Sequence, residues 1–504
     1  MENLIEVLIS DVKTPESFIE RWRGHGEEKS EMQKFWLDLL ESVCGVENAF
    51  EVIDFEKKIK DKDSSLLRID AYIASTKVLI EQKSLNVDLD KKIQQSDGEY
   101  LTPFEQAKRY YGGLPHYENP RWIIVSNFKE FHIHDMNMPE AEPEIILLEN
   151  LEDEAEKFRF LIDVNAKAPR EIREEKISQE AGRLVEKLKN NLEPLYDPAN
   201  DEVEIERQKK SLTVFCVRIV FLLYAEDSGL LEKNQFHDYL QARRLMPKEA
   251  LEKLFKILSQ KPEERSPNLH KDFKKFPYVN GGLFDKKVIE VPEIDDKVLD
   301  IILCEMSEGF NWSGITPPIF GAIFERVLSG ERISQGMHYT TLENIHKVID
   351  PLFLDDLKIE LENILANSNG RTRIKKLLNF QNKLAALRFL DPACGSGNFL
   401  TESFISLRRL ENQILRELPD PEIKVSISQF HGIEINDFAV AVARTALYIA
   451  NHQMWREAGN LTKLDPLPLK NINRIKEESA MTLNPDTAPD SSEEEYVWRD
   501  PGWT

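Results

Sequence analysis

Three charged residues lie on two neighbouring strand-like runs near the N-terminus. Asp70 lies in LLRIDAYIAS, and Glu81 and Lys83 lie in VLIEQKS, which gives the pattern D-x10-E-x-K. Residues two apart in a strand point to the same face, so Glu81 and Lys83 are expected to project together. Asp70 is expected to meet them at one end of a hairpin. Two carboxylates and a backbone carbonyl form a hard oxygen site suited to Mg²⁺.

This set of residues has the chemistry needed to hydrolyse a phosphodiester. A metal held by Asp70 and Glu81 would polarise the phosphodiester, and the Lys83 ammonium would orient the attacking water. The alternative is that all three are ordinary solvent-facing strand charges. Both runs, however, place charges among apolar residues, where an unpaired charge is costly. Glu41, at the end of the first predicted helix, could also reach the metal, although an exposed helix position is the simpler interpretation.

A helix is predicted directly after this pair of strands. Pro103 opens it, and paired glycines end it in FEQAKRYYGG. Gln106 and Tyr110 lie one turn apart on one face of this helix. The spacing resembles the QxxxY element of PD-(D/E)xK nucleases, which implies that both residues support the active site and the DNA backbone.

A second candidate site lies in LRFLDPACGSGNFLTESF. We expect a buried strand at 387–390, a tight turn from Asp391 to Gly397, and a helix that opens at Asn398. Small residues let the backbone approach a ligand closely, and a helix N-terminus favours an anion. Leu400 replaces the third glycine of the dinucleotide pattern G-x-G-x-x-G, so a pyrophosphate ligand is less favoured. A glycine turn without a ligand is the alternative.

The segment DPACGSG resembles motif I of DNA methyltransferases that modify amino groups. In those enzymes the loop packs against the methionine part of S-adenosylmethionine. The resemblance therefore implies cofactor contacts for Asp391, Pro392, Ala393, Gly395 and Gly397.

Two further segments complete the expected cofactor site. Glu434 lies near the end of the next predicted strand, 430–435, and 43 residues after Asp391. There an acid can accept hydrogen bonds from both ribose hydroxyls. Upstream, HYT resembles motif X of the same enzymes, which implies cofactor contacts for Tyr339 and Thr340. The alternative is that Thr340 only caps the following helix.

Hydrophobic patterning predicts the elements that position these residues. An N-terminal α/β unit is expected to close near residue 150, a helical region to extend to about residue 330, and a parallel α/β sheet to follow. The expected elements are a helix at 16–45, a hairpin from 66–75 and 77–85, strands at 121–126 and 131–135, a buried helix around 214–225, and alternating helices and strands over 331–470.

Composition limits the classes of protein to consider. The 504 residues suffice for about three domains, and 41% apolar with 31% charged residues is a globular mixture. The most apolar run, 214–225, is too short to cross a bilayer. The N-terminus lacks the basic residues of a signal peptide. The four cysteines are scattered, so a disulfide framework is not expected and a reducing cytoplasm fits. The net charge of −23 argues against indiscriminate nucleic-acid coating, but it is compatible with a basic groove.

Several phrases, in order, resemble the MmeI-like type IIL restriction–modification enzymes: PFEQAKRYYGGLP, RWIIVSNF, FPYVNGGLFD, ITPPIFGAIFERVL, GMHYTT, DPLFLDDL, LDPACGSGNFL and GIEINDFAVAVARTALY. The resemblance implies a multidomain α/β chain. Its expected parts are a PD-(D/E)xK endonuclease domain (1–150), a helical spacer (151–330), and the N-terminal part of an incomplete Rossmann-like class I adenine methyltransferase (331–504). It further implies S-adenosylmethionine and Mg²⁺ as cofactors and double-stranded DNA as partner.

The chain departs from this family near its C-terminus. The methyl-transfer motif NPPY or NPPF is not found, and the nearest counterpart is DPGW at 500–503, while Glu478 or Ser479 could contact the adenine ring. We therefore expect a C-terminally truncated enzyme that does not methylate DNA alone and depends on a recognition subunit or a downstream-encoded part. The alternatives are a non-catalytic DNA-binding or regulatory remnant, and a nuclease gated by S-adenosylmethionine.

Overall fold

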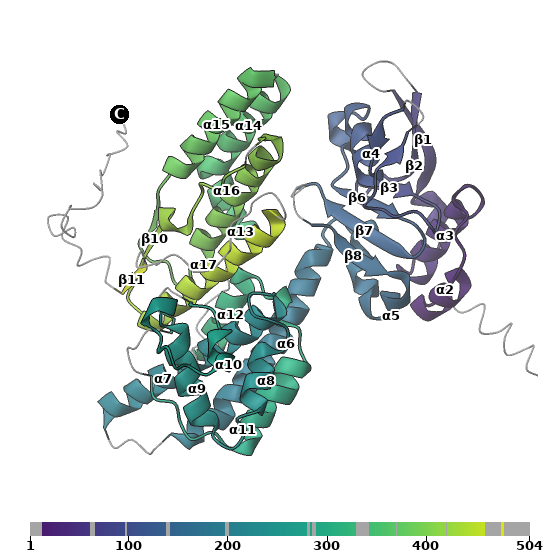
Figure 1. Cartoon of the computed structure of the whole chain (residues 1–504). Coiled ribbons are helices and arrows are strands. Elements are labelled where there is room, and N and C mark those ends of the chain that lie inside the picture. The colour runs from purple at the N-terminus through teal and green to yellow at the C-terminus, as the bar shows by residue number, and fades with distance from the viewer. Residues whose placement is uncertain are drawn as a thin grey trace, which may run out of the picture. The chain divides into compact units, whose positions relative to one another are not determined.

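The computed structural model divides the chain into two compact units, residues 1–175 and 176–504 (Figure 1). Each unit is described by itself. The structure describes residues 13–60, 66–95, 98–137, 142–196, 201–279, 283–284, 289–328, 342–368, 370–419, 421–458 and 475–477.

The first unit is built on a mixed sheet with the strand order β1-β2-β3-β6-β7-β8. Its strands are β1 (Asp54–Lys60), β2 (Leu66–Ile73), β3 (Val78–Gln82), β6 (Trp122–Ser126), β7 (Glu130–Asp135) and β8 (Glu144–Leu147). Neighbours run antiparallel, except β3 and β6, which are parallel. The predicted hairpin is confirmed, because Ala71 pairs with Ile80 across β2 and β3. A short ribbon of β4 (Ile93–Gln94) and β5 (Tyr100–Leu101) lies outside this sheet.

Helices cover both faces of this sheet (Figure 1). The helices α2 (Pro15–Trp22), α3 (Glu28–Ser42) and α5 (Leu151–Glu154) contribute to a core that includes Ile80, and α4 (Pro103–Arg109) contributes to a core that includes Leu79. Successive strand residues point to opposite faces, so the apolar residues Val78, Leu79 and Ile80 of β3 supply both cores.

The prediction of one helix over 16–45 is wrong. Two helices, α2 and α3, are separated by residues 23–27. Gly24 has φ +82°, a left-handed conformation that often follows the end of a helix. A Cβ on Gly26 would lie 2.4 Å from Leu85 Cβ, so this bend packs directly on the segment after β3. The break therefore determines where α3 begins.

The second unit begins with helices. They are the remainder of α6 (Pro169–Leu192), α7 (Glu202–Asp227), α8 (Gln235–Gln241), α9 (Pro247–Leu258), α10 (Lys271–Lys274), α11 (Asp296–Asp300) and α12 (Pro317–Leu328). The predicted apolar helix is confirmed as α7, which is buried from Phe215 to Ala225. In the part of the chain that the structure describes, no helix has the length and apolarity to cross a membrane.

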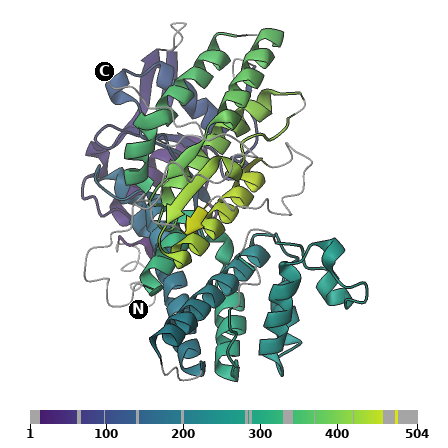
Figure 2. The ribbon, with the colours of Figure 1, turned by 90° about the vertical axis from the view of Figure 1, so that its left-hand side faces the viewer.

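The predicted alternation of helices and strands over 331–470 is confirmed. The elements are α13 (Leu342–Ile349), α14 (Asp355–Ala366), α15 (Gly370–Ala386), β9 (Phe389–Asp391), α16 (Asn398–Glu417), β10 (Phe430–Glu434), α17 (Asp437–Ala458) and β11 (Ile475–Glu477). The three strands are parallel in the order β11-β10-β9. Helices α14, α15 and α16 run alongside one another in both views (Figures 1 and 2).

The prediction of a buried strand at 387–390 is wrong in its bounds and in its burial. The strand is β9, at 389–391, and the Leu390 side chain is 50% exposed. In the described sheet β9 is the edge strand, and none of its three residues is fully buried.

One continuous hydrophobic core joins the helices α6–α12 with the elements α13–α17. Within residues 176–504, the spacer and the α/β part therefore pack as a single body. The predicted division into domains at 1–150, 151–330 and 331–504 stays a prediction.

A contact between α3 and β3 leads to a stability prediction. Trp36 Nε1 donates to Gln82 Oε1 at 2.8 Å, and both side chains are fully buried. Trp36→Phe would leave a buried amide oxygen without its donor, at a cost of about 1–3 kcal/mol. We expect a lower urea midpoint for the first unit by circular dichroism. Phe50→Ala, at a 77% exposed position, is the control and should change little; equal midpoints for Trp36→Phe and the wild type would contradict the role of this bond.

Candidate active sites

The strands β2 and β3 bring three predicted nuclease residues together. The Gln82 backbone N–H, next to Glu81, donates to Asp70 Oδ2 at 2.8 Å. The Lys83 ammonium forms an ion pair with the Glu81 carboxylate. The predicted proximity of Asp70, Glu81 and Lys83 is therefore present in the fold.

Hydrogen bonds around Gln82 fix the end of β3. The Gln82 side chain points to the α3 side, where it accepts from Trp36, and its Nε2 donates to the Lys83 carbonyl at 3.0 Å. The Lys83 N–H donates to the Ser126 carbonyl of β6 at 2.7 Å. Contacts with α3 and with β6 thus fix the backbone that carries Glu81 and Lys83.

Burial dominates the electrostatics of this cluster. Glu81 is 1% exposed, and burial raises its pKa to about 8, with a further rise from the Asp70 carboxylate and an opposing effect of Lys83. Burial also raises the pKa of Asp70, against the effect of the Gln82 N–H. For Lys83, burial lowers the pKa, but the Glu81 carboxylate outweighs it and the net pKa is raised.

One oxygen of the cluster is unsatisfied. Among the described residues, no group donates a hydrogen bond of standard geometry to the buried Glu81 Oε2, although the nearby Tyr110 hydroxyl lowers the Glu81 pKa. A buried carboxylate oxygen without a donor is a position that a cation or a water would satisfy. In the described part of the chain, no group of three or more His, Cys, Asp and Glu side chains is arranged around a metal position. Any metal here would therefore rest on two carboxylates, backbone oxygens and water.

The helix α4 places the predicted QxxxY pair beside Glu81. A capping box between Thr102 and Glu105 begins the helix. Gln106 Nε2 lies 3.4 Å from the Tyr110 hydroxyl. Burial raises the pKa of Tyr110, and the nearby Glu81 carboxylate raises it further. Tyr110 therefore lies close enough to Glu81 for the two groups to affect one another's pKa, and the supporting role of the pair stays a prediction.

A third acid near this cluster was missed from the sequence. Glu28, in the first turn of α3, raises the pKa of both Asp70 and Lys83, and its Oε2 lies 3.5 Å from Ser84 Oγ. Glu41, the helix acid considered from the sequence, instead pairs with Lys13 at 2.8 Å. The glycines at 24 and 26 were the available signal, because a helix break there places Glu28 at the start of α3.

The predicted glycine turn is confirmed in the second unit. Gly395 and Gly397 have φ +52° and +82°, and Gly397 precedes the first residue of α16. A Cβ on Gly397 would lie 2.9 Å from Ala443 Cβ of α17. Both the backbone conformation and the close approach of α17 therefore favour glycine at this position.

Glu434 lies against this turn. Its Oε2 accepts from the Gly395 N–H and its Oε1 from the Asn436 N–H, both at 2.9 Å. Asp391, at the end of β9, accepts from the Ala393 N–H at 3.1 Å. Burial raises the pKa of Asp391, and the Glu434 carboxylate raises it further. Two carboxylates thus meet at the carboxyl ends of adjacent parallel strands, with Ala393 and Pro392 exposed on the turn.

Several predicted positions lie where the fold gives no test of them. Tyr339 and Thr340 lie outside the described residues. The same holds for Glu478, Ser479 and the segment 500–503.

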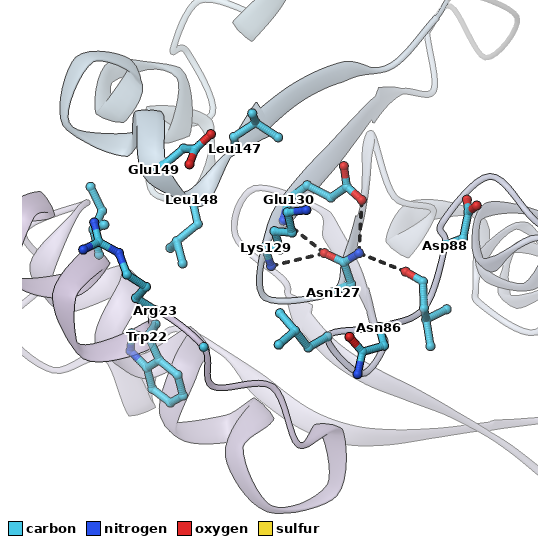
Figure 3. Close-up of a pocket in the computed structure, with 14 residues that line it drawn as sticks. Trp22, Arg23, Asn86, Asp88, Asn127, Lys129, Glu130, Leu147, Leu148 and Glu149 are labelled. Carbon is cyan, nitrogen blue, oxygen red and sulfur yellow. Dashed lines mark hydrogen bonds between the residues drawn. The ribbon is translucent and has the colours of Figure 1, made fainter.

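A pocket of about 700 Å³ lies in the first unit beyond the end of β3 (Figure 3). Arg23, Asp88, Lys129 and Glu149 are among its lining residues, so charges of both signs surround it. The Asn127 amide is fully used there, with its Nδ2 donating to Val87 O at 2.9 Å. None of the predicted site residues lines this pocket.

Comparison with known proteins matches three parts of the chain to family models. Residues 13–194 match the family model of the MmeI N-terminal domain, residues 210–284 that of the MmeI helicase spacer domain, and residues 366–504 that of the MmeI DNA-methyltransferase domain. The solved structure of the type IIL restriction–modification enzyme MmeI in complex with DNA has a TM-score of 0.52 and 31% identity, over 62% of this chain and 41% of that chain. The chain is an MmeI-like protein.

Curated relatives of this MmeI-like chain are methyltransferases by name. DNA methyltransferase A of Bacillus subtilis (strain 168) is 36% identical over 325 residues, which are 61% of this chain and 36% of that protein. Adenine-specific methyltransferase PglX of Streptomyces coelicolor is 41% identical over 66 residues, 13% of this chain and 5% of that protein. The chain therefore spans well under half of the length of the relatives it matches.

The raised pKa of Glu81 predicts a pH-dependent stability of this MmeI-like chain. Its value of about 8, against 4.5 for the free group, means that the folded state binds an extra proton between these pH values. Stability is therefore expected to fall as pH rises through this window and to level off above it. Because one pKa unit corresponds to about 1.4 kcal/mol, the first unit should lose at least about 1 kcal/mol between pH 5 and pH 8.

Urea unfolding at several pH values checks this expectation. Glu81→Gln should lack most of the decline, because glutamine does not titrate. Glu41→Gln, outside the cluster, is the matched control and should keep the wild-type slope. The same decline in Glu81→Gln as in the wild type would show that another group causes it.

Proposed function

We propose that this chain carries two catalytic centres of a DNA restriction–modification protein: a Mg²⁺-dependent endonuclease site and the S-adenosylmethionine site of an adenine methyltransferase. The observation that carries the proposal is the presence, in one MmeI-like chain, of the buried Asp70–Glu81–Lys83 cluster and the glycine turn against Glu434. The first unit would then be a PD-(D/E)xK nuclease domain, and the α/β part of the second unit a Rossmann-like methyltransferase domain.

The nuclease residues fit a magnesium ion. Asp70 and Glu81 would hold it, since Glu81 Oε2 is buried without a donor of standard geometry among the described residues, and carboxylate oxygens are preferred Mg²⁺ ligands. When bound, the metal would supply Lewis-acid polarisation of the scissile phosphate. Lys83 would orient the attacking water through its ammonium and offset the charge that develops on phosphorus. Gln106 and Tyr110 would support Glu81 from α4.

The second site fits S-adenosylmethionine, which would supply the transferable methyl group. Each Glu434 oxygen accepts one backbone N–H, so each keeps a lone pair for a ribose hydroxyl. The turn residues Asp391, Pro392, Ala393, Gly395 and Gly397 would hold the methionine part. Tyr339 and Thr340 remain proposed contacts on the basis of the HYT pattern alone.

Double-stranded DNA is the proposed substrate of both centres. The solved structure of MmeI holds that enzyme in complex with DNA, and one relative is named an adenine-specific methyltransferase. Transfer to an adenine amino group needs the base flipped out and stacked in a shaped pocket. The segment DPGW at 500–503, the nearest counterpart of the motif that would hold the base, lies outside the described residues.

The nuclease proposal predicts metal-dependent nicking that needs the charged cluster. Asp70→Asn should remove a metal ligand, and Lys83→Met should lower the rate roughly 100-fold, as for other preorganised charge stabilisers. Supercoiled plasmid with Mg²⁺ is the assay, run with and without S-adenosylmethionine to detect gating. Glu41→Gln is the control and should nick at the wild-type rate. Wild-type nicking in both cluster variants would remove these residues from the mechanism.

The cofactor proposal predicts that S-adenosylmethionine binding depends on Glu434. Glu434→Ala removes hydrogen bonds to a charged acceptor, which are worth about 1.5–3 kcal/mol, so affinity should fall roughly 10- to 150-fold. Titration calorimetry measures it. Glu417→Ala, at the exposed far end of α16, is the control. Equal affinity in Glu434→Ala and wild type would refute the ribose role, and preferential binding of NADH would favour a dinucleotide site.

A further inference from the structure

His346 of α13 is held between two carboxylates. Its Nδ1 lies 2.8 Å from Asp350 Oδ1, in the π-helical segment η11 (Asp350–Leu354) that continues α13. Its Nε2 lies 3.1 Å from Glu402 Oε1, in α16. The Glu402 side chain is only 6% exposed. The imidazole therefore lies between a carboxylate on its own helical segment and a carboxylate on α16.

Only the doubly protonated ring satisfies this arrangement. A neutral imidazole has one N–H, so its other nitrogen would present a lone pair to a carboxylate oxygen. The imidazolium donates to both partners. The Glu402 hydrogen bond raises the pKa of His346 and Asp350 raises it further, against the lowering effect of burial.

The other charges around this ring are few in the described structure. Lys358 of α14 lies 3.9 Å from the same Asp350 oxygen and competes for it only at long range. Lys347, on α13 itself, is exposed and its ammonium lies 3.4 Å from Asn344 Oδ1. Among the described residues, two acids thus contact the ring directly, and Lys358 is a cation near one of them.

The two helices joined by His346 both lead to the proposed cofactor site. Glu402 lies one turn after Asn398, the residue with which α16 leaves the glycine turn. Leu342, which begins α13, follows Thr340 by two residues in the chain. Ile345 and Ile349 are buried on the apolar face of α13, and the Asp350–His346–Glu402 chain adds a directional contact with α16.

We propose that the imidazolium of His346 is a positioning group that holds α13 against α16 and thereby sets the affinity of the methyltransferase site for S-adenosylmethionine. This inference rests on the proposed function. If α13 is released from α16, only the docked fraction of molecules is competent to bind, and the apparent affinity falls by that fraction. His346 itself touches no ligand in this scheme.

The sign of the pH effect follows from the raised pKa. The contribution of the imidazolium is complete below 6.5, the ordinary value, and is lost as pH rises through the higher folded value. S-Adenosylmethionine affinity should therefore be greatest near pH 6 and fall roughly tenfold at higher pH, the worth of one charge-assisted hydrogen bond.

Titration calorimetry of the full chain with S-adenosylmethionine, from pH 6 to pH 9, tests the proposal. His346→Gln should bind roughly tenfold more weakly at pH 6 and show no such decline. Glu402→Gln should move the decline to lower pH, because it removes the acid that most raises the His346 pKa. Lys347→Ala, the exposed neighbour, is the matched control and should keep the wild-type profile. Equal wild-type and His346→Gln profiles would overturn the proposal.

Amide hydrogen exchange separates this inference from the function on which it rests. Without any cofactor, His346→Gln should accelerate exchange in α13 at pH 6, while α7 keeps its wild-type protection. Unchanged exchange in α13 would overturn the positioning role. If the wild-type chain binds no S-adenosylmethionine at any pH while α13 exchange responds as expected, the cofactor proposal fails and the contact between the helices stands.

Discussion

Burial of the Glu81 carboxylate is the constraint on which the first unit depends. An acid that is 1% exposed, beside a second acid, is costly unless neighbouring groups compensate. Lys83 supplies the opposite charge, and the Gln82 N–H stabilises the charge on Asp70. The compensation is incomplete, because burial still raises the Glu81 pKa to about 8. The surrounding apolar cores must stabilise a cluster that is unfavourable on its own, which is typical of functional sites.

Helices on both faces of the sheet contribute to positioning Glu81. On one face, α3 holds Gln82 through Trp36, and on the other, α4 places Tyr110 beside Glu81. Residue alternation along β3 makes both possible, because Glu81 and Gln82 point to opposite sides. The buried Gln82 amide, held by Trp36 on one face of the sheet, thus fixes the orientation of Glu81 on the opposite face.

The second unit solves a related problem at the ends of parallel strands. Asp391 and Glu434 meet beside a turn whose backbone N–H groups donate to them, so two acids lie close together. The small residues Gly397 and Ala443 let α17 pack closely on this turn. In both units, backbone N–H groups at strand ends stabilise carboxylates that the proposed chemistry requires. Further from the turn, His346 links α13 to α16, the helix that follows the turn, through charged hydrogen bonds.

The sequence by itself determined the local elements and most of the proposed site residues. The hairpin that carries Asp70 and Glu81, the helix with Gln106 and Tyr110, and the glycine turn before α16 all follow from patterns within a few residues, since periodicity and turn chemistry depend on local backbone geometry. Glu28, the Trp36–Gln82 bond and the His346–Glu402 pair were decided by tertiary structure. Their partners are far apart in the chain, and only packing brings them together: 46 residues separate Trp36 from Gln82, and 56 separate His346 from Glu402. The helix break is an intermediate case: Gly24 and Gly26 are visible in the sequence, but the contact of Gly26 with Leu85, in the segment after β3, is decided by tertiary structure.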